Sequence, residues 1–387
     1  MTVYLDHNAT TPPLPAVLQA MAQVQAEHWA NPSSTHVPGQ AARQAMAQAR
    51  ARIAAFLGCK PAELVLGSGA TEANHHAVLG ALQSRAGEGR RRWLLSAVEH
   101  PGLMALAAHL QQQGVPVTRV PVDGTGRLDL AALRAALGPD VALLSLMGAN
   151  NETGVCMPLA EAVALCDAAG AWLHVDATQL IGKSPFRFAG SGIDLLSASA
   201  HKLNGPKGVG TLVVRQGLAL PALLHGRQER QRRGGTENLA GIAGFAAACD
   251  AHAADLPHEL ERLARLRDRL EVALLDALPG VHVVGRAAPR VPNTLCLRFA
   301  ELDADPVLTR LERAGVVASS GAACSAGGTQ PSHVLLAMGE SPAHARGGIR
   351  FSLGRTTTEA HIDTAIAAIV RALAPLLEPT ASLESAA

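Results

Sequence analysis

The sequence predicts an α/β fold with a mainly parallel central sheet, and two observations support that prediction. Short apolar runs alternate with longer helical patterns up to about residue 255. One of these runs, residues 141–147, is almost continuously apolar, as expected of a strand covered on both faces. The composition agrees, because 48% of the 387 residues are hydrophobic and 17% are charged, which suffices for a large core.

The elements of this alternation follow one another along the chain. We expect strands at residues 63–66, 92–96, 117–121, 141–147, 172–175 and 195–197. We expect helices at residues 71–82, 101–114 and 159–169, the last of which ends before Gly170. Strands separated by helices at this spacing indicate β-α-β units, and therefore parallel pairing.

The pattern changes near residue 255. A helix rich in arginine and glutamate is predicted at residues 258–278, and smaller strands and helices follow it. We therefore expect a large domain over residues 15–255 and a smaller α/β domain over residues 256–387. The N-terminal segment 1–14 is expected to pack near the smaller domain.

Charge and cysteine content exclude several classes of protein. Lysine plus arginine number 33 and aspartate plus glutamate 32, so nothing favours a nucleic acid or an anionic membrane as partner. The six cysteines form no C-x-x-C pair and are too few for a disulfide scaffold, so no metal site is expected. Since neither a signal peptide nor a long apolar run is present, we expect a cytoplasmic protein.

Lysine is scarce, and its four positions narrow the chemistry. Lys60 and Lys183 are predicted in surface loops and Lys207 in a turn, whereas Lys202 directly follows the apolar strand at residues 195–198. Covalent amine chemistry with a carbonyl cofactor needs a lysine, because arginine cannot supply it. Lys202 is therefore the candidate for covalent attachment of such a cofactor.

Asp176 ends the strand at residues 172–175, so it and Lys202 both lie at carboxyl ends of strands, where α/β sheets bind ligands. Pyridoxal phosphate requires such a pair: the lysine forms a Schiff base, and the carboxylate keeps the pyridine nitrogen protonated. Alone, Asp176 could equally cap a helix and Lys202 could be a solvated loop residue. Together, Asp176 and Lys202 favour a binding site for pyridoxal phosphate.

Two further features fit a phosphorylated cofactor. The glycine turn at residues 66–72 joins a strand to a helix, and with Ala70 and Thr71 it predicts a cup for one phosphate, although a plain tight turn would look similar. A dinucleotide is excluded, because Glu72 stands where the fingerprint needs a small residue. His100 ends another strand and could stack on the ring and move protons, but a lone histidine is more often structural.

Cys324 lies among small residues at positions 319–329, which favour a mobile loop and an exposed thiolate. Cys156, after a turn, is ambiguous. The remaining cysteines lie in or beside apolar elements and are expected to be small buried residues: Cys59, Cys166, Cys249 and Cys296.

Nearly end to end, the chain resembles the cysteine desulfurases of the NifS/IscS type, pyridoxal-phosphate enzymes of the class V aminotransferase superfamily. The resemblance rests on these motifs, in order: LDHNATTP (5–12), NPSS (31–34), SGATE (68–72), EHP (99–101), NNETG (150–154), HVDATQ (174–179), SAHK (199–202), RGGTEN (233–238), SGAACS (320–325) and IRFSLGR (349–355). Residues 228–233 and the short tail are closer to the nitrogen-fixation branch than to the housekeeping branch.

The resemblance implies a fold of the aspartate-aminotransferase type (fold type I) and a homodimer with its sites at the subunit interface. It implies that Cys324 takes sulfur from L-cysteine, leaves L-alanine, and passes its persulfide sulfur to an acceptor or scaffold protein for iron–sulfur cluster assembly. It also implies that Lys202 attaches the cofactor, that Asp176 pairs with the pyridine nitrogen, and that Gln179 bonds to the ring hydroxyl. His100 would stack on the ring and transfer protons, and Asn151 and Arg350 would bind the substrate carboxylate. The implied phosphate ligands are Ala70, Thr71, Ser199, His201 and, from the other subunit, Thr236.

Four positions depart from the usual family pattern: His75, Gly148, Ala200 and Arg227. They could alter the phosphate cup, the substrate mouth and the preference between cysteine and selenocysteine. A selenocysteine lyase or another pyridoxal-phosphate β-lyase or aminotransferase-like enzyme is the alternative, and a non-catalytic sulfur-handling protein is a third. The sequence names neither the sulfur acceptor nor the pathway it serves.

Overall fold

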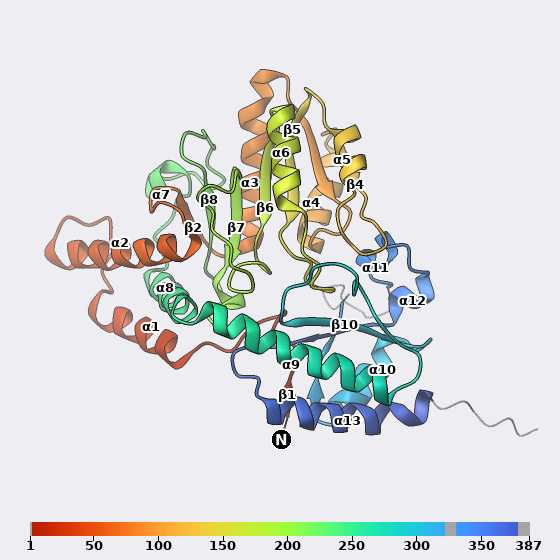
Figure 1. Ribbon diagram of the computed structural model, residues 1–387. Coiled ribbons are helices and arrows are strands. Elements are labelled where there is room, and N and C mark those ends of the chain that lie inside the picture. Colours follow the sequence, from red (N-terminus) through yellow and green to blue (C-terminus); the bar gives the residue numbers. More distant parts are fainter. Residues whose placement is uncertain (1, 322–329, 378–387) are drawn as a thin grey trace, which may run out of the picture.

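The computed structural model describes residues 2–321 and 330–377, and its largest feature is a seven-stranded sheet in the order β2-β8-β7-β6-β5-β3-β4 (Figure 1). The five strands from β7 to β4 are parallel, whereas β8 runs antiparallel to both β7 and β2. The mainly parallel α/β fold is thus confirmed. The strands are β2 (Leu64–Gly67), β3 (Arg92–Ser96), β4 (Val117–Val120), β5 (Val141–Met147), β6 (Trp172–Asp176), β7 (Leu195–Ser199) and β8 (Gly210–Val214).

Successive side chains give this sheet two apolar faces, as the pleat of a strand requires. Leu144 and Leu196 belong to one buried cluster, which α2, α6 and α8 complete. Their neighbours Leu143 and Leu195 belong to another, which α3 and α4 cover. The helices around the sheet are α1 (Pro15–Glu27), α2 (Val37–Leu57), α3 (Ala70–Arg85), α4 (Pro101–Gln112), α5 (Leu130–Ala136), α6 (Leu159–Ala169), α7 (Gln228–Gln231) and α8 (Leu239–Ala253), with short 3₁₀ turns η1 (Ala86–Glu88) and η2 (Ala200–Lys202).

A second core lies around a four-stranded antiparallel sheet, β12-β13-β10-β9. Leu270, Phe299, Phe351 and Ile362 are fully buried in it, between this sheet and the long helices that flank it. Its elements are α9 (Leu256–Ala277), β9 (Val281–Val283), β10 (Thr294–Phe299), α10 (Ala304–Arg313), β11 (Val316–Val317), β12 (Ser319–Ser320), α11 (His333–Ala337), α12 (Pro342–Arg346), β13 (Gly348–Ser352) and α13 (Glu359–Leu377).

The N-terminal segment joins this second core. Strand β1 (Val3–Tyr4) pairs in parallel with β11, and Asp6 forms an isolated bridge with Ser352. Leu5 is fully buried in the same apolar cluster. The segment thereby runs between the two sheets, although the domain boundary at residues 255 and 256 stays a prediction.

Helix α13 has the length and apolar character of a membrane-spanning segment, judged by those two properties alone among the described residues. Its apolar side chains Ile362, Ala365, Ile369 and Leu373 are buried in the second core. That packing is what an amphipathic core helix requires.

Candidate active site

A cavity of about 520 Å³ lies where the parallel strands of the large sheet end. Asp176 at the end of β6, Ser199 at the end of β7 and the first turn of α3 line one side of it. Arg350 of β13 and Ser319 of β12 line the other. The cavity therefore stands at the carboxyl edge of the sheet, as α/β ligand sites do, and between the two sheets.

Lys202 lines the cavity from η2, the turn that follows β7 directly. Its Nζ donates to the backbone carbonyls of Asn8 at 2.6 Å and Ala9 at 2.8 Å. The N-terminal segment thus holds the amine at the cavity. Sequence reasoning placed Lys202 correctly at a strand end but did not identify these two acceptors.

Asp176 is 6% exposed and is held by two donors. Its Oδ2 accepts from Asn74 Nδ2 at 2.7 Å, and its Oδ1 accepts from the backbone N–H of Thr178 at 3.0 Å. These bonds fix the carboxylate at the cavity wall. Asn74 was missed by the sequence analysis, although it lies one helical turn after Ala70, on the cavity side of α3.

His100 lines the cavity and is the N-cap of α4, with Pro101 in the first turn. Its Nδ1 accepts from the backbone N–H of Gly102 at 3.1 Å, so the neutral ring carries its proton on Nε2. Burial lowers the pKa of His100, and the nearby Asp176 charge opposes that shift. An uncharged, flat imidazole therefore faces the cavity at neutral pH.

The first turn of α3 forms a cup at one end of the cavity. The predicted phosphate ligands Ala70, Thr71, Ser199 and His201 all line it. The first N–H groups of a helix have no partner within the helix, so they are available to an anion.

The backbone of β8 passes very close to this cup. A Cβ on Gly210 would lie 2.6 Å from Gly69 Cα and 2.6 Å from the carbonyl oxygen of Ala198. Glycine at position 210 is therefore required for the helix terminus to seat against the sheet.

Lys183 was predicted in a surface loop, and that prediction is wrong. It is 7% exposed, and its Nζ donates to Asn8 Oδ1 at 2.7 Å and to Oε1 of Gln179. The hydrophobic residues of the turn after β6, including Leu180 and Ile181, anchor that turn in the core and draw the lysine inside. Gln179 itself lines the cavity, as predicted.

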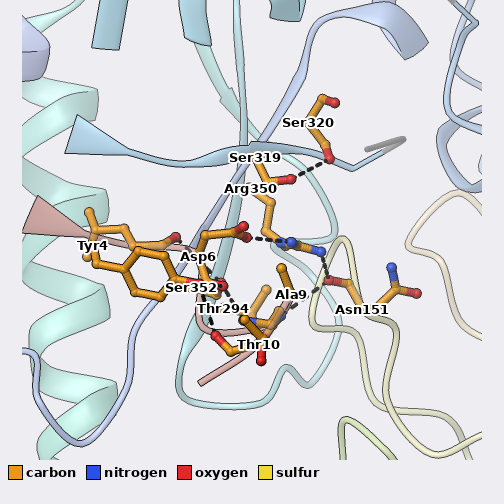
Figure 2. A network of polar contacts seen from close by, with 12 residues as sticks. Tyr4, Asp6, Ala9, Thr10, Asn151, Thr294, Ser319, Ser320, Arg350 and Ser352 are labelled. Atoms are coloured by element: carbon orange, nitrogen blue, oxygen red, sulfur yellow. Dashed lines mark hydrogen bonds and ion pairs between the residues drawn. The ribbon is translucent and has the colours of Figure 1, made fainter. Parts of the chain in front are cut away.

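Arg350 lies in a polar network at the cavity wall, which Figure 2 shows from close by. Its Nη2 donates to Asp6 Oδ1 at 2.6 Å and its Nη1 to the backbone carbonyl of Asn151 at 3.0 Å. Arg350 Nε is buried without a partner among the described residues. Asn151 and Arg350, predicted together, thus meet at the cavity, whereas Asp6 was not singled out from the sequence.

Two predicted residues are not seen at the cavity. Cys324 lies outside the described residues, but Ser319 and Gly321, which precede it, line the cavity. Thr236 lines two other hollows of this chain, beside Glu237, so its action in a second subunit stays a prediction.

Cys166, Cys249 and Cys296 are buried as expected, whereas Cys59, expected to be buried, is half-buried. Burial raises the pKa of Cys59, Cys166 and Cys296 to about 12, and that of Cys249 well above its usual value. Burial also raises the pKa of the ambiguous Cys156 to about 11. Their thiols stay protonated at neutral pH, which leaves Cys324 as the candidate nucleophile.

Two of the departures from the family pattern have local explanations. A Cβ on Gly148 would lie 2.8 Å from Leu180 Cδ2, so Leu180 fills the space that a larger side chain would need. His75 is half-buried on α3, and its Nδ1 lies 2.8 Å from the Thr71 carbonyl oxygen. Neither residue lines the cavity.

The cavity fits a phosphorylated pyridine cofactor. It offers the Lys202 amine, a buried carboxylate, a flat imidazole and a helix N-terminus seated on glycine, each in contact with the same space, and Lys207 lines it as well. Its volume of about 520 Å³ is that of an ordinary small-molecule site.

Comparison with known proteins agrees with this geometry. The profile of the family described as Aminotransferase class-V matches residues 3–364. The chain is 44% identical to a cysteine desulfurase of Klebsiella pneumoniae, over 96% of this chain and 94% of that protein. It is 45% identical to a cysteine desulfurase of Cereibacter sphaeroides, over 98% and 97%.

Solved structures show the same relationship. A NifS-like protein superposes with a TM-score of 0.89 at 33% identity, over 96% of this chain and 99% of that chain. A NifS-like protein from Rickettsia africae superposes with a TM-score of 0.86 at 29% identity, over the same shares.

Proposed function

This chain belongs to the cysteine desulfurases of the class-V aminotransferase family, and from that premise we propose how its residues carry out the reaction. Enzymes of this family generally depend on pyridoxal phosphate, and the cavity is the proposed site for it. The observation that carries the proposal is the convergence of Lys202, Asp176, His100 and Arg350 on one cavity.

The cofactor would be held by five kinds of contact. Lys202 would bind it covalently, Asp176 would keep the proton on its pyridine nitrogen, and His100 would stack on its ring. Gln179 would donate to its ring oxygen. Ala70, Thr71, Ser199 and His201 would hold the phosphate, with Thr236 contributed by a second subunit of a homodimer. When bound, the cofactor draws electrons from the substrate and weakens its C–S bond.

The substrate L-cysteine is oriented by its carboxylate. Arg350 and Asn151 bind that group, and a guanidinium is well suited to it because its N–H groups match the two carboxylate oxygens. The Asp6 carboxylate holds one end of Arg350, which keeps the side chain from swinging out of the cavity.

Protons move between the substrate carbons and two side chains, Lys202 and His100. The amine of Lys202, when it is free, would take the α-proton of the substrate. His100 is uncharged at neutral pH and lines the cavity, so it can relay a proton there.

Cys324 accepts the sulfur. Its thiolate attacks the substrate Sγ, the C–S bond breaks, and the electron pair of that bond passes to Cβ, which takes up a proton to give the methyl group of L-alanine. The persulfide left on Cys324 passes its outer sulfur to an acceptor or scaffold protein for iron–sulfur cluster assembly. We propose that this takes place in the cytoplasm.

The test is an assay of alanine and sulfide formed from L-cysteine in the presence of a thiol reductant, which releases the persulfide sulfur as sulfide. Wild-type protein should form both, whereas Cys324→Ala should keep the bound, yellow cofactor and form neither. Cys59→Ala, at a half-buried cysteine away from the cavity, should behave as wild type. Unchanged alanine formation by Cys324→Ala would overturn the role of Cys324 and favour another β-lyase.

A further inference from the structure

A second lysine lies buried beside the cavity, and the reaction described above does not use it. Lys183 is 7% exposed, and no carboxylate forms an ion pair with it in the part of the chain that the structure describes. Burying a polar side chain is costly unless its donors are satisfied. The contacts of Lys183 should therefore reveal why it is there.

The Lys183 amine contacts two side-chain oxygen atoms. Lys183 Nζ donates to Asn8 Oδ1 at 2.7 Å and to Oε1 of Gln179. Gln179 Nε2 donates to the backbone carbonyl of Asn8 at 3.0 Å. A backbone carbonyl can only accept, so the NH₂ end of Gln179 must face Asn8 and its Oε1 must face Lys183.

This arrangement determines what Gln179 can offer to the cavity that it lines. Its oxygen is occupied by Lys183, and one of its two N–H groups is occupied by Asn8. The donor left for a bound molecule is the second N–H group, and the amide oxygen already faces the Lys183 amine. Without Lys183, the Asn8 carbonyl alone would hold the amide in this direction, and the amide oxygen would lose its donor.

Asn8 connects the same lysine to Lys202. The backbone carbonyl of Asn8 accepts from both Gln179 and Lys202 Nζ, while its side-chain oxygen accepts from Lys183 and from Asn293 Nδ2 at 3.1 Å. Lys183 thus holds the side chain of the residue whose backbone carbonyl accepts from Lys202. Burial, and then the charges of Lys202 and Arg350, lower the pKa of Lys183, which favours an uncharged amine with two N–H groups for these two acceptors.

We propose that Lys183 is a positioning residue that locks the Gln179 amide so that an N–H group faces the ring oxygen of the bound cofactor. An N–H donor stabilises that oxygen in its ionised form, because a hydrogen bond to a charged group favours the charge. The inference rests on the proposed function, since it presupposes that pyridoxal phosphate binds in this cavity.

The test uses Lys183→Met, which keeps the length of the side chain and removes its donors. Two quantities are measured: the dissociation constant of pyridoxal phosphate from the apoprotein, and the visible absorbance of the bound cofactor across a pH series. We expect the dissociation constant to rise about tenfold, as for the loss of a hydrogen bond to a charged oxygen. The pH at which the visible band changes should rise as well.

Lys60→Met is the matched control, because Lys60 is an exposed lysine whose Nζ contacts Gln216. It should match wild type in both measurements. The double variant Lys183→Met with Gln179→Leu should be no weaker than Gln179→Leu alone, because Lys183 acts through Gln179. Additive losses would overturn the inference.

A second variant covers the case in which Lys183→Met fails to fold. Gln179→Glu keeps the shape of the side chain and gives Lys183 an ion-pair partner, but it removes the N–H group. It should show the same change in the visible band, and an unchanged band would overturn the inference. A wild-type protein with no visible band would instead overturn the proposed function, so the two failures are distinguishable.

Discussion

Glu99 directly precedes His100 and shows how burial sets the charge of a single residue near the site. It is fully buried, and its Oε1 accepts from Ser96 Oγ at 2.6 Å and from the backbone N–H of Met147 at 2.7 Å. Burial raises the pKa of Glu99 to about 8, so the side chain is uncharged at pH 7. It therefore joins β3 to β5 beneath the cavity without adding a negative charge next to Asp176.

Glu99→Gln should consequently remove a pH dependence of stability. Between the usual pKa of 4.5 and the folded value of about 8, the unfolded wild-type chain has released a proton that the folded chain retains, so wild-type stability is lost as the pH rises. The free energy of unfolding of the variant, relative to wild type, should rise by about 1.4 kcal/mol for each pH unit in this range.

Urea unfolding at pH 6 and pH 8 measures this difference. Glu27→Gln, at the exposed end of α1, is the control and should show no such trend. A Glu99→Gln variant whose stability runs parallel to wild type at both pH values would show that Glu99 is already ionised in the fold.

His100→Phe separates the two roles proposed for the imidazole. The phenyl ring keeps a flat neighbour for the cofactor, so pyridoxal phosphate should still bind. Alanine formation should fall by about 10²–10⁴-fold, the usual contribution of a proton-transfer group. Retained turnover in a variant that still binds the cofactor would rule out proton transfer by His100.

The pH profile of wild-type alanine formation gives an independent check on the same residue. Because burial lowers the pKa of His100, its uncharged form persists below the usual value of 6.5. The acidic limb of the profile should therefore lie below pH 6.5. A limb above that value would contradict an uncharged His100 as the proton acceptor.

Individual residues differ in how well the sequence predicts them. Lys202, Asp176 and His100 follow apolar strands, so the pattern could place them at the edge of the sheet, whereas the role of His100 was left open until the family resemblance was considered. Lys183 could not, because its burial depends on the packing of the turn that carries it. Asn74 and Asp6 are polar residues with no local signal, and their roles arise from contacts with Asp176 and Arg350.

At the scale of elements, the phosphate cup depends on the approach of α3 to β8. Gly210→Ala should destabilise the fold by about 1–3 kcal/mol, because its methyl group would overlap the backbone of Gly69 and Ala198. It should also weaken cofactor binding by displacing the helix terminus. Gly87→Ala, where an added Cβ meets nothing within 4 Å, is the control.

Thermal unfolding and cofactor titration of these two variants measure the effect. If Gly210→Ala bound pyridoxal phosphate as wild type does, the seating of α3 on β8 would not matter for the site. The strand β8 itself was missed by the sequence analysis, although its residues Leu212, Val213 and Val214 form an apolar run. The apolar runs that became β3, β5 and α6 were predicted with their observed boundaries.

At the scale of the whole molecule, the N-terminal segment links the two sheets at the site. Asp6 contacts Arg350 of β13, and Asn8 contacts Thr294 of β10, Lys183 and Lys202. No local pattern predicts such contacts, because their partners lie hundreds of positions apart. The resemblance to a known family could place the segment near the smaller sheet, but it did not reveal this network.

The Asp6→Asn variant tests the contact between the N-terminal segment and Arg350. The side chains of Asp6 and Arg350 are 17% and 6% exposed, and removing one partner leaves the other charge buried. The free energy of unfolding should fall by about 3 kcal/mol, and the KM for L-cysteine should rise. Asp303→Asn breaks an exposed pair with Arg346 and should cost under about 1 kcal/mol. Equal losses in the two variants would contradict a special role for Asp6.

The central claim is that Lys202 attaches the cofactor, and the identity of the attached lysine tests it most directly. Lys202 and Lys207 both line the cavity, and Lys183 lies beside it, so three amines compete for the role. Borohydride reduction of the cofactor-loaded protein, followed by peptide mass spectrometry, locates the bond. We predict the cofactor mass on Lys202. Its appearance on Lys207 or Lys183, or on no lysine, would contradict the account.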